Sequence, residues 1–276
     1  MRLLLSIAIC TLFLASPGMA QKNDKNPMVL IHTDFGDIKV ELYNETPQHR
    51  DNFLKLVREG FYNDLLFHRC INEFMVQGGD PNSRGAAPGA QLGSGGPGYT
   101  VEAEINSKFV HTKGALSAAR QGDQVNPEKR SSGSQFFLMH GRTFTAQELD
   151  MMAQRANQQA ELQQVFKWLR LPENKAEMDG WNTLAQARNN TALEAKLKEL
   201  LPKAEEKFGK VNRVEYTEEH KKAYATIGGA PHLDGNYTVF GHVVEGLDII
   251  DKIATTETNP QDRPLKDIKM SMEVIE

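Results

Sequence analysis

Hydrophobic and polar residues alternate over short runs in much of the chain, which predicts β-strands of a few residues each. Two such runs fill residues 27–43 and flank Gly36, which can supply the positive φ that a tight hairpin turn needs. Thr46 followed by Pro47 predicts the start of a helix, because these residues suit the N-cap and first helical positions. Gly60 predicts the end of that helix. We therefore expect a hairpin followed by a helix that packs on a sheet.

The stretch 66–80 is the one around which the chain is expected to be organised. It reads as two short strands joined at Asn72 and Glu73, which lets the following side chains converge: Arg69, Phe74, Met75 and Gln77. Further strands are predicted at 113–119, 134–139, 237–244 and 268–275, with a short helix at 247–253. Roughly eight strands with two short helices suit a closed antiparallel barrel, although the pattern alone favours a sandwich almost equally.

The pattern changes to a helical one after Phe144. Within residues 145–226, one predicted helix face gathers Leu149, Met152, Ala156, Gln163, Phe166 and Leu169, and a second gathers Leu193, Leu197, Leu201, Ala204 and Phe208. Helix starts are predicted by two capping boxes, Thr145 with Glu148 and Thr191 with Glu194. Breaks are predicted at Pro172, Gly180, Pro202 and Gly209. The sequence therefore predicts an inserted subdomain of three or four helices.

The N-terminus predicts export. Residues 1–20 combine a basic start at Arg2, an apolar run and a small-residue exit at Ala20, which is typical of a secretory signal peptide. The apolar run is shorter than the roughly 20 residues that a membrane span needs, so an uncleaved anchor is the weaker alternative. With a formal net charge of −4, the chain shows no preference for nucleic acid or anionic membranes. We expect a periplasmic or secreted protein in which Cys70, alone after cleavage, is an inert buried thiol.

Three other kinds of site are poorly supported by the sequence. Gly93, Gly95 and Gly98 form a G-x-G-x-x-G pattern, but it follows a loop and contains Pro97, whereas a dinucleotide fingerprint follows a strand and opens a helix. The eight histidines form no H-E-x-x-H or close Cys/His set, so no metal is predicted. A serine hydrolase is disfavoured because no G-x-S-x-G occurs.

Four separated segments occur in the order in which cyclophilins carry them: FHR at 67–69, FMVQGGD at 74–80, GSQFF at 133–137 and LDGNYTVFG at 233–241. The chain therefore resembles the cyclophilin family of peptidyl-prolyl cis-trans isomerases over residues 27–144 and 230–276. The resemblance implies a mainly β fold, a closed eight-stranded antiparallel barrel capped by two helices. It leaves residues 145–229 as a helical insertion.

The resemblance also implies the site residues. It makes Arg69 the catalytic residue and gives a hydrophobic proline pocket to Phe74, Met75, Phe137 and Leu233. By the same resemblance, the substrate backbone or the arginine is contacted by Gln77 and Gln135, and the groove is lined by Ala119 and Arg120. His68 matches a position on the rim of the groove.

Three positions depart from the family pattern. Tyr237 stands where many members carry histidine, and Arg120 stands in place of a more familiar asparagine. His232 stands where the cyclosporin-sensitive members carry tryptophan, which removes an indole donor and much apolar area. We therefore expect Tyr237 to contact the substrate with altered strength and Arg120 to change which residues are preferred beside proline. His232 is expected to contact the substrate and to make cyclosporin binding weak.

An arginine suits this chemistry because its guanidinium stays charged and offers five donors. Rotation about an Xaa-Pro bond must break amide resonance, at a cost of about 18–20 kcal/mol. A donor aimed at the prolyl nitrogen is bonded more strongly in the twisted transition state than in the planar ground state. The predicted function is cofactor-free isomerisation of proline-containing peptides and unfolded proteins. The alternative is a holdase-type chaperone or peptide-binding module that uses the groove and the helical insertion.

Overall fold

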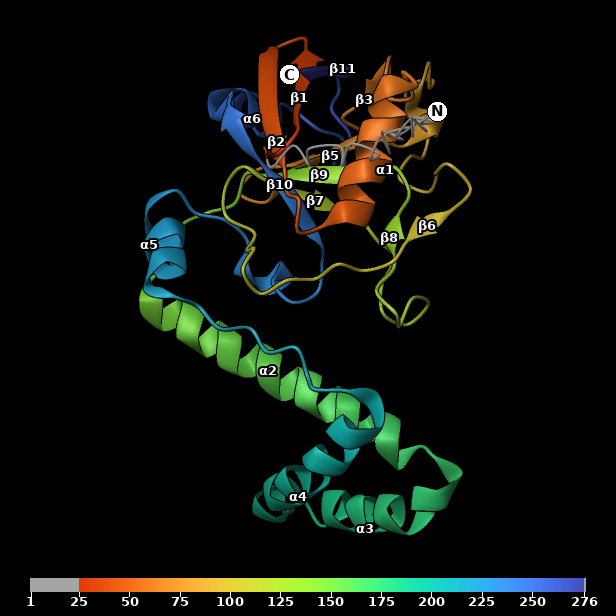
Figure 1. Cartoon of the computed structure of the whole chain (residues 1–276), viewed down its shortest axis with the longest axis vertical. Coiled ribbons are helices and arrows are strands. Elements are labelled where there is room, and N and C mark those ends of the chain that lie inside the picture. Colours follow the sequence, from red (N-terminus) through yellow and green to blue (C-terminus); the bar gives the residue numbers. More distant parts are fainter. Residues whose placement is uncertain (1–24, 276) are drawn as a thin grey trace, which may run out of the picture.

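The computed structural model describes residues 25–275 and combines a curled, mainly antiparallel β-sheet with a projecting set of helices (Figure 1). The predicted signal peptide, residues 1–20, lies outside the described residues. Among residues 25–275, no helix has both the length and the apolar character needed to cross a membrane.

The main sheet has nine strands, which is one more than the barrel predicted from the resemblance. In their order across the sheet the strands are β3 (Leu65–Leu66), β11 (Lys269–Ile275), β1 (Met28–Thr33), β2 (Gly36–Leu42), β10 (Val239–Glu245), β7 (Ala115–Ala118), β9 (Phe136–Met139), β5 (Met75–Gly78) and β4 (Arg69–Ile71). The two edge strands, β3 and β4, follow each other in the chain, but within residues 25–275 no ladder pairs them, so the sheet is curled and the predicted closed eight-stranded barrel is not confirmed. Two further short strands, β6 (Thr100–Val101) and β8 (Ser131–Ser132), pair separately, and β8 was not predicted.

The main core lies between the sheet and two helices, α1 (Pro47–Arg58) and α6 (Leu247–Ala254), on what we call the inner face. Phe136 and Leu138 of β9 belong to this core, whereas Phe137 and Met139 belong to a separate cluster on the opposite, outer face. This alternation follows from the two-residue period of a strand. The hairpin of β1 and β2 is confirmed, and Gly36 has the predicted positive φ of 128°.

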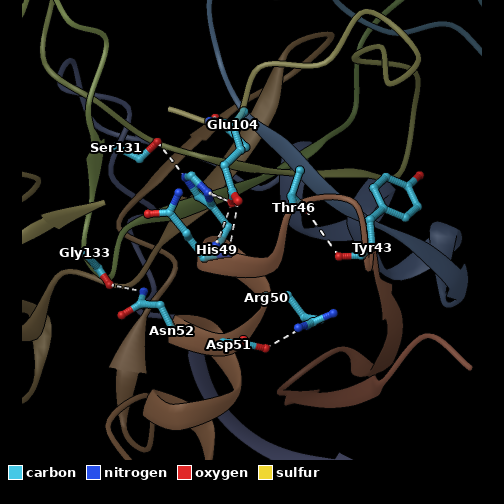
Figure 2. A network of polar contacts seen from close by, with 11 residues as sticks. Tyr43, Thr46, His49, Arg50, Asp51, Asn52, Glu104, Ser131 and Gly133 are labelled. Carbon is cyan, nitrogen blue, oxygen red and sulfur yellow. Dashed lines mark hydrogen bonds and ion pairs between the residues drawn. The ribbon is translucent and has the colours of Figure 1, made fainter. Parts of the chain in front are cut away.

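The start of α1 is capped differently from the prediction (Figure 2). Thr46 occupies the N-cap position but makes no side-chain capping hydrogen bond. Instead, the Glu104 carboxylate accepts hydrogen bonds from the backbone N–H groups of Gln48 and His49, at 3.1 and 2.9 Å. Glu104 also lies 2.7 Å from His49 Nδ1, and His49 Nε2 lies 2.9 Å from the Ser131 hydroxyl. Because Ser131 is buried, this arrangement secures the helix end and presents no nucleophile at the surface.

The helices between the strands, residues 146–226, are called the helical arm. They are α2 (Ala146–Leu169), η2 (Pro172–Asn174), α3 (Lys175–Gln186), α4 (Asn190–Phe208) and α5 (Glu218–Thr226). Figure 1 shows α2 leading away from the sheet to α3 and α4, after which the chain runs back along α2 to α5. The capping box of Thr145 and Glu148 is confirmed.

Two other sequence signals in the arm were wrong. The N-cap of α4 is Asn189, whose side chain accepts from the Ala192 N–H, and Thr191 lies inside the helix. Pro202 lies within α4, and Gly180 lies within α3, so neither residue ends a helix. The helix continues through Pro202 because Leu200 and Ala204 on either side of it are buried in a common core.

The arm contains two small hydrophobic cores. The proximal core joins the sheet part to the arm and comprises Phe144, Leu149 and Tyr224 with Val110, Met152 and Tyr216. The distal core lies far along the arm and is centred on Val165, Leu169, Trp181, Leu197, Leu200 and Ala204. The single predicted stripe on α2 therefore serves two cores, and the predicted member Gln163 is exposed.

Candidate active site on the outer face of the sheet

Three of the predicted site residues form a row across adjacent strands. The register pairs Arg69 with Gln77 and Gln77 with Phe137. Directly opposed residues of antiparallel strands lie on the same face, so these side chains share the outer face. Cys70, next to Arg69, packs into the inner core, as predicted for a buried thiol, and burial raises the pKa of its thiol to about 12. The row is therefore on the outer surface of the sheet and not in its interior.

An apolar cluster lies on the same face. We call it the outer patch, and it comprises Met75, Phe137 and Leu233, which are buried, with Phe74, Ala119 and Tyr237, which are partly buried. Tyr237 meets Phe137 edge-on with ring centroids 5.9 Å apart, and His232 stacks on Phe74 at 5.4 Å. The structure thus brings together every residue of the predicted proline pocket.

Arg69 lies beside the outer patch in β4 and retains contact with solvent. Its side chain is 42 % exposed, and its Nε lies 3.4 Å from the carboxylate of Asp262, which is itself 41 % exposed. An ion pair this exposed contributes about 0–1 kcal/mol and leaves the guanidinium free to make other hydrogen bonds. The charge of Arg69 is therefore not neutralised by a buried carboxylate.

The two glutamines are connected to each other and to the glycine-rich loop. Gln77 Nε2 donates to Gln135 Oε1 at 2.9 Å, and Gln135 Nε2 donates to the carbonyls of Gly93 and Gly95 at 3.0 and 2.7 Å. Within residues 25–275, no side-chain hydrogen bond joins either glutamine to the Arg69 guanidinium. The observed contacts hold the loop at 93–95 over the strands.

The glycines of that loop are explained by packing. A Cβ atom at Gly95 would lie 2.1 Å from an oxygen of Asp80, and the Asp80 carboxylate accepts the Gly95 N–H at 3.3 Å. Glycine is needed here because the loop backbone passes close to a buried carboxylate.

The prediction that His68 lies on the rim of the groove is wrong. Its side chain is only 4 % exposed, and a Cβ at Gly93 would come within 3.6 Å of its ring. Neither ring nitrogen has a hydrogen-bond partner in the part of the chain that the structure describes. Burial lowers the pKa of His68 to about 4, which keeps the ring neutral near pH 7.

Arg120 and Tyr237 form one wall beside the outer patch. Arg120 Nε donates to the carbonyl of Asn236 at 2.7 Å, and its guanidinium carbon lies 4.5 Å from the centre of the Tyr237 ring. A second basic residue, Lys129, donates to the Asn236 side chain at 2.7 Å. These contacts fix the loop at 120–130 against the segment that carries Tyr237.

A buried polar network beneath the outer patch was not predicted. His111 Nδ1 lies 2.6 Å from Asp234 Oδ1, and the His111 ring stacks on Phe137 with centroids 6.0 Å apart. The other Asp234 oxygen accepts hydrogen bonds from the hydroxyls of Tyr224 and Tyr216, at 2.7 and 2.9 Å. Asp234 follows Leu233 in the segment LDGNYTVFG, but no neighbouring residue in the sequence indicates that Asp234 bonds His111, Tyr216 and Tyr224.

No metal centre accompanies these residues in the described structure. Within residues 25–275, no three His, Cys, Asp or Glu side chains are grouped so that they could hold a metal ion. The chemistry available on the outer face is therefore that of an exposed guanidinium beside an apolar patch.

Comparisons with known proteins bear on the family of this chain. The family model described as cyclophilin type peptidyl-prolyl cis-trans isomerase/CLD matches residues 28–160 and 189–274. A protein of Staphylococcus saprophyticus named as a peptidyl-prolyl cis-trans isomerase is 30 % identical over 256 residues, which cover 92 % of this chain and 94 % of the relative. A similarly named protein of Staphylococcus aureus is 28 % identical over 241 residues, with 87 % of each chain covered.

The fold is also similar to that of a solved structure. A cyclophilin type peptidyl-prolyl cis-trans isomerase of Cryptosporidium parvum matches with a TM-score of 0.51 at 19 % sequence identity, over 91 % of this chain and 98 % of the other. At this identity the match bears on the fold alone.

Proposed function

From the family to which this chain belongs, the cyclophilin-type peptidyl-prolyl cis-trans isomerases, we infer that Arg69 and the outer patch carry the isomerase activity. The activity itself, rotation of Xaa-Pro peptide bonds, follows from the family and from the named relatives. The assignment of residues to steps is our proposal.

One observation supports the proposal most directly. The register sets the half-exposed Arg69 in line with Gln77 and Phe137 on the outer face. The charged donor Arg69 thus lies in the same row as Phe137, which is a buried member of the outer patch. The outer patch contains five hydrophobic side chains and one tyrosine. Such a surface can bind a proline ring while it offers a hydrogen bond to the adjoining amide.

The proposed mechanism needs no covalent step. The outer patch holds the proline ring, and the Arg69 guanidinium donates to the prolyl nitrogen as the bond twists and the nitrogen lone pair becomes available. This hydrogen bond is stronger in the transition state than in the planar ground state, and such differential binding lowers the barrier. A preorganised donor in a partly dry site contributes about 10²–10³ in rate.

The direct test compares Arg69 with a matched arginine. We expect Arg69→Ala to lower kcat/KM for a short Xaa-Pro peptide by about 10²-fold. Arg69→Lys should recover only part of the loss, because lysine retains the charge but not the planar fork. Arg58→Ala, at the exposed end of α1, is the control and should retain full activity. Equal rates for wild type and Arg69→Ala would rule out the proposed role.

The clients are proposed from the sequence. A leader at residues 1–20 would deliver the enzyme to the periplasm or the exterior, where unfolded exported proteins would be its substrates. A fusion of residues 1–30 to a reporter that works only outside the cytoplasm tests this, and an inactive reporter would contradict it.

Cyclosporin is proposed to bind weakly. His232 stacks on Phe74 at the edge of the outer patch, and a histidine offers less apolar area there than the tryptophan of sensitive members. A nanomolar inhibition constant in the peptide assay would contradict this proposal.

A further inference from the structure

A cavity lies where the helical arm meets the sheet part. Its volume is about 320 Å³, near the lower end of the range for small-molecule sites, roughly 300–1,000 Å³. On the side of the arm it is lined by Met151 and Met152 of α2, and on the other side by Ala230 and His232. Of the predicted site residues His232 alone lines this cavity, and the proposed mechanism does not use it.

The cavity adjoins the outer patch through two shared residues. His232 lines the cavity and also stacks on Phe74 with ring centroids 5.4 Å apart. Ala230 lines the cavity and also packs in the hydrophobic cluster of the outer patch. A polypeptide that has its proline at the patch can therefore extend past His232 and place a neighbouring side chain in the cavity.

The lining is mixed, because methionine and aromatic side chains that suit an apolar group lie beside two arginines and the carboxylates of Glu73 and Glu148, and Glu148 is 3.9 Å from Arg142. Met151 is 44 % exposed, and flexible methionines adapt to side chains of different shape. The Arg142 guanidinium lies over the Phe144 ring at 3.9 Å, which fixes a donor group at the cavity wall. Arg155 is a second donor at the wall, and its side chain makes no hydrogen bond or ion pair with any other described residue.

We propose that this cavity is a second substrate subsite, which binds an apolar side chain of the same polypeptide whose proline lies on the outer patch. Arg142 and Arg155 then donate to carbonyl groups on either side of that residue. The subsite would give the enzyme a preference for unfolded hydrophobic segments over isolated Xaa-Pro units. This inference rests on the proposed function of the outer patch.

The test uses peptides of roughly ten residues, which reach about 30 Å when extended. Each peptide has one proline, and leucine is compared with alanine at each flanking position in turn. At one or two positions we expect leucine to lower KM about tenfold in the wild type, as expected for filling a hydrophobic pocket. Met151→Glu should reduce this leucine-to-alanine ratio to about one. Gln154→Glu is the control, since it adds the same charge to α2 at an exposed residue outside the cavity.

A direct binding measurement separates the subsite from catalysis. With ¹³C-methyl methionine labelling, leucine peptides should shift the signals of Met151 and Met152, and alanine peptides should leave them in place. No leucine preference in the wild type, an unchanged ratio in Met151→Glu, or unmoved methionine signals would overturn the subsite. If no peptide at all is isomerised, the proposed function fails, while the methionine signals still decide whether the cavity binds leucine.

Discussion

At the scale of single residues, His68 is expected to make stability depend on pH. Its ring is buried without a hydrogen-bond partner in the described chain, and burial lowers its pKa to about 4, compared with about 6.5 in the unfolded chain. The folded state therefore binds this proton less readily than the unfolded state. The contribution of His68 to the free energy of unfolding is therefore greatest above about pH 6.5, and it falls by about 3 kcal/mol as the pH falls towards 4.

Urea unfolding of wild type and His68→Leu between pH 7 and pH 4 measures this effect. The variant should lose about 3 kcal/mol less free energy of unfolding over that range than the wild type does. Cys70→Ala is the control, because it changes a nearby buried side chain whose pKa of about 12 leaves it uncharged between pH 7 and pH 4, and it should keep the wild-type slope. Identical slopes for wild type and His68→Leu would show that His68 does not titrate as described.

His68 also shows where residue-scale prediction ends. The family resemblance carried by four short motifs implied which residues gather at the outer patch, and Met75 and Phe137 meet there because β5 and β9 are neighbours in the sheet. The burial of His68 depends on the loop at 93–95, which is held by Asp80 and Gln135. No local pattern around His68 reports a contact with a loop so distant in the sequence.

At the scale of elements, α5 is expected to fix the segment that carries Leu233. The short helix η3 (Pro231–Leu233) is followed by Asp234, whose buried carboxylate accepts from the hydroxyl of Tyr224 in α5 and from that of Tyr216. Hydrogen bonds to a charged group contribute about 1.5–3 kcal/mol each. We expect Tyr224→Phe to lower the free energy of unfolding by about 2 kcal/mol and to raise KM, because Leu233 loses its support.

The matched variant is Tyr216→Phe, which removes a similar hydrogen bond from a less buried position. Its effects on the free energy of unfolding and on KM should be smaller than those of Tyr224→Phe. Denaturant unfolding and peptide kinetics on both variants provide the comparison. If Tyr224→Phe changes stability but not KM, the network supports the fold without positioning the outer patch.

The elements differ in how well the sequence predicts them. The β1–β2 hairpin and the start of α2 were predicted correctly, because their turn and capping box are made by residues near one another in the chain. The cap of α1 comes from Glu104, and the apolar positions of α2 divide between two cores. Neither arrangement can be read from the helix alone, since each depends on what tertiary structure brings against it.

At the scale of the whole molecule, we expect that the distal half of the helical arm can be deleted without loss of the fold, whereas the whole arm cannot. Removing residues 145–226 would also remove Tyr216 and Tyr224, which bond Asp234, and Leu149 and Met152 of the proximal core. Asn157 offers a better boundary. Its side chain donates to the Val214 carbonyl at 2.9 Å and accepts from the Val214 N–H at 2.7 Å. Helix α2 and the segment between α4 and α5 are therefore already in contact there.

We therefore predict that a variant without residues 158–213, with Asn157 joined to Val214 by about four residues, folds and isomerises short peptides at a rate close to that of the wild type. The deleted segment contains the whole distal core, and the proximal core, the cavity and the outer patch remain.

If the distal arm is a holdase surface, the variant should lose the ability to suppress aggregation of an unfolded protein that the wild type protects. Circular dichroism, the peptide assay and light scattering measure the three properties, with Arg69→Ala as the complementary control that should lose only isomerisation. Unchanged suppression of aggregation would contradict the holdase role of the distal arm, and loss of peptide activity in a folded variant would show that the distal arm helps to build the site.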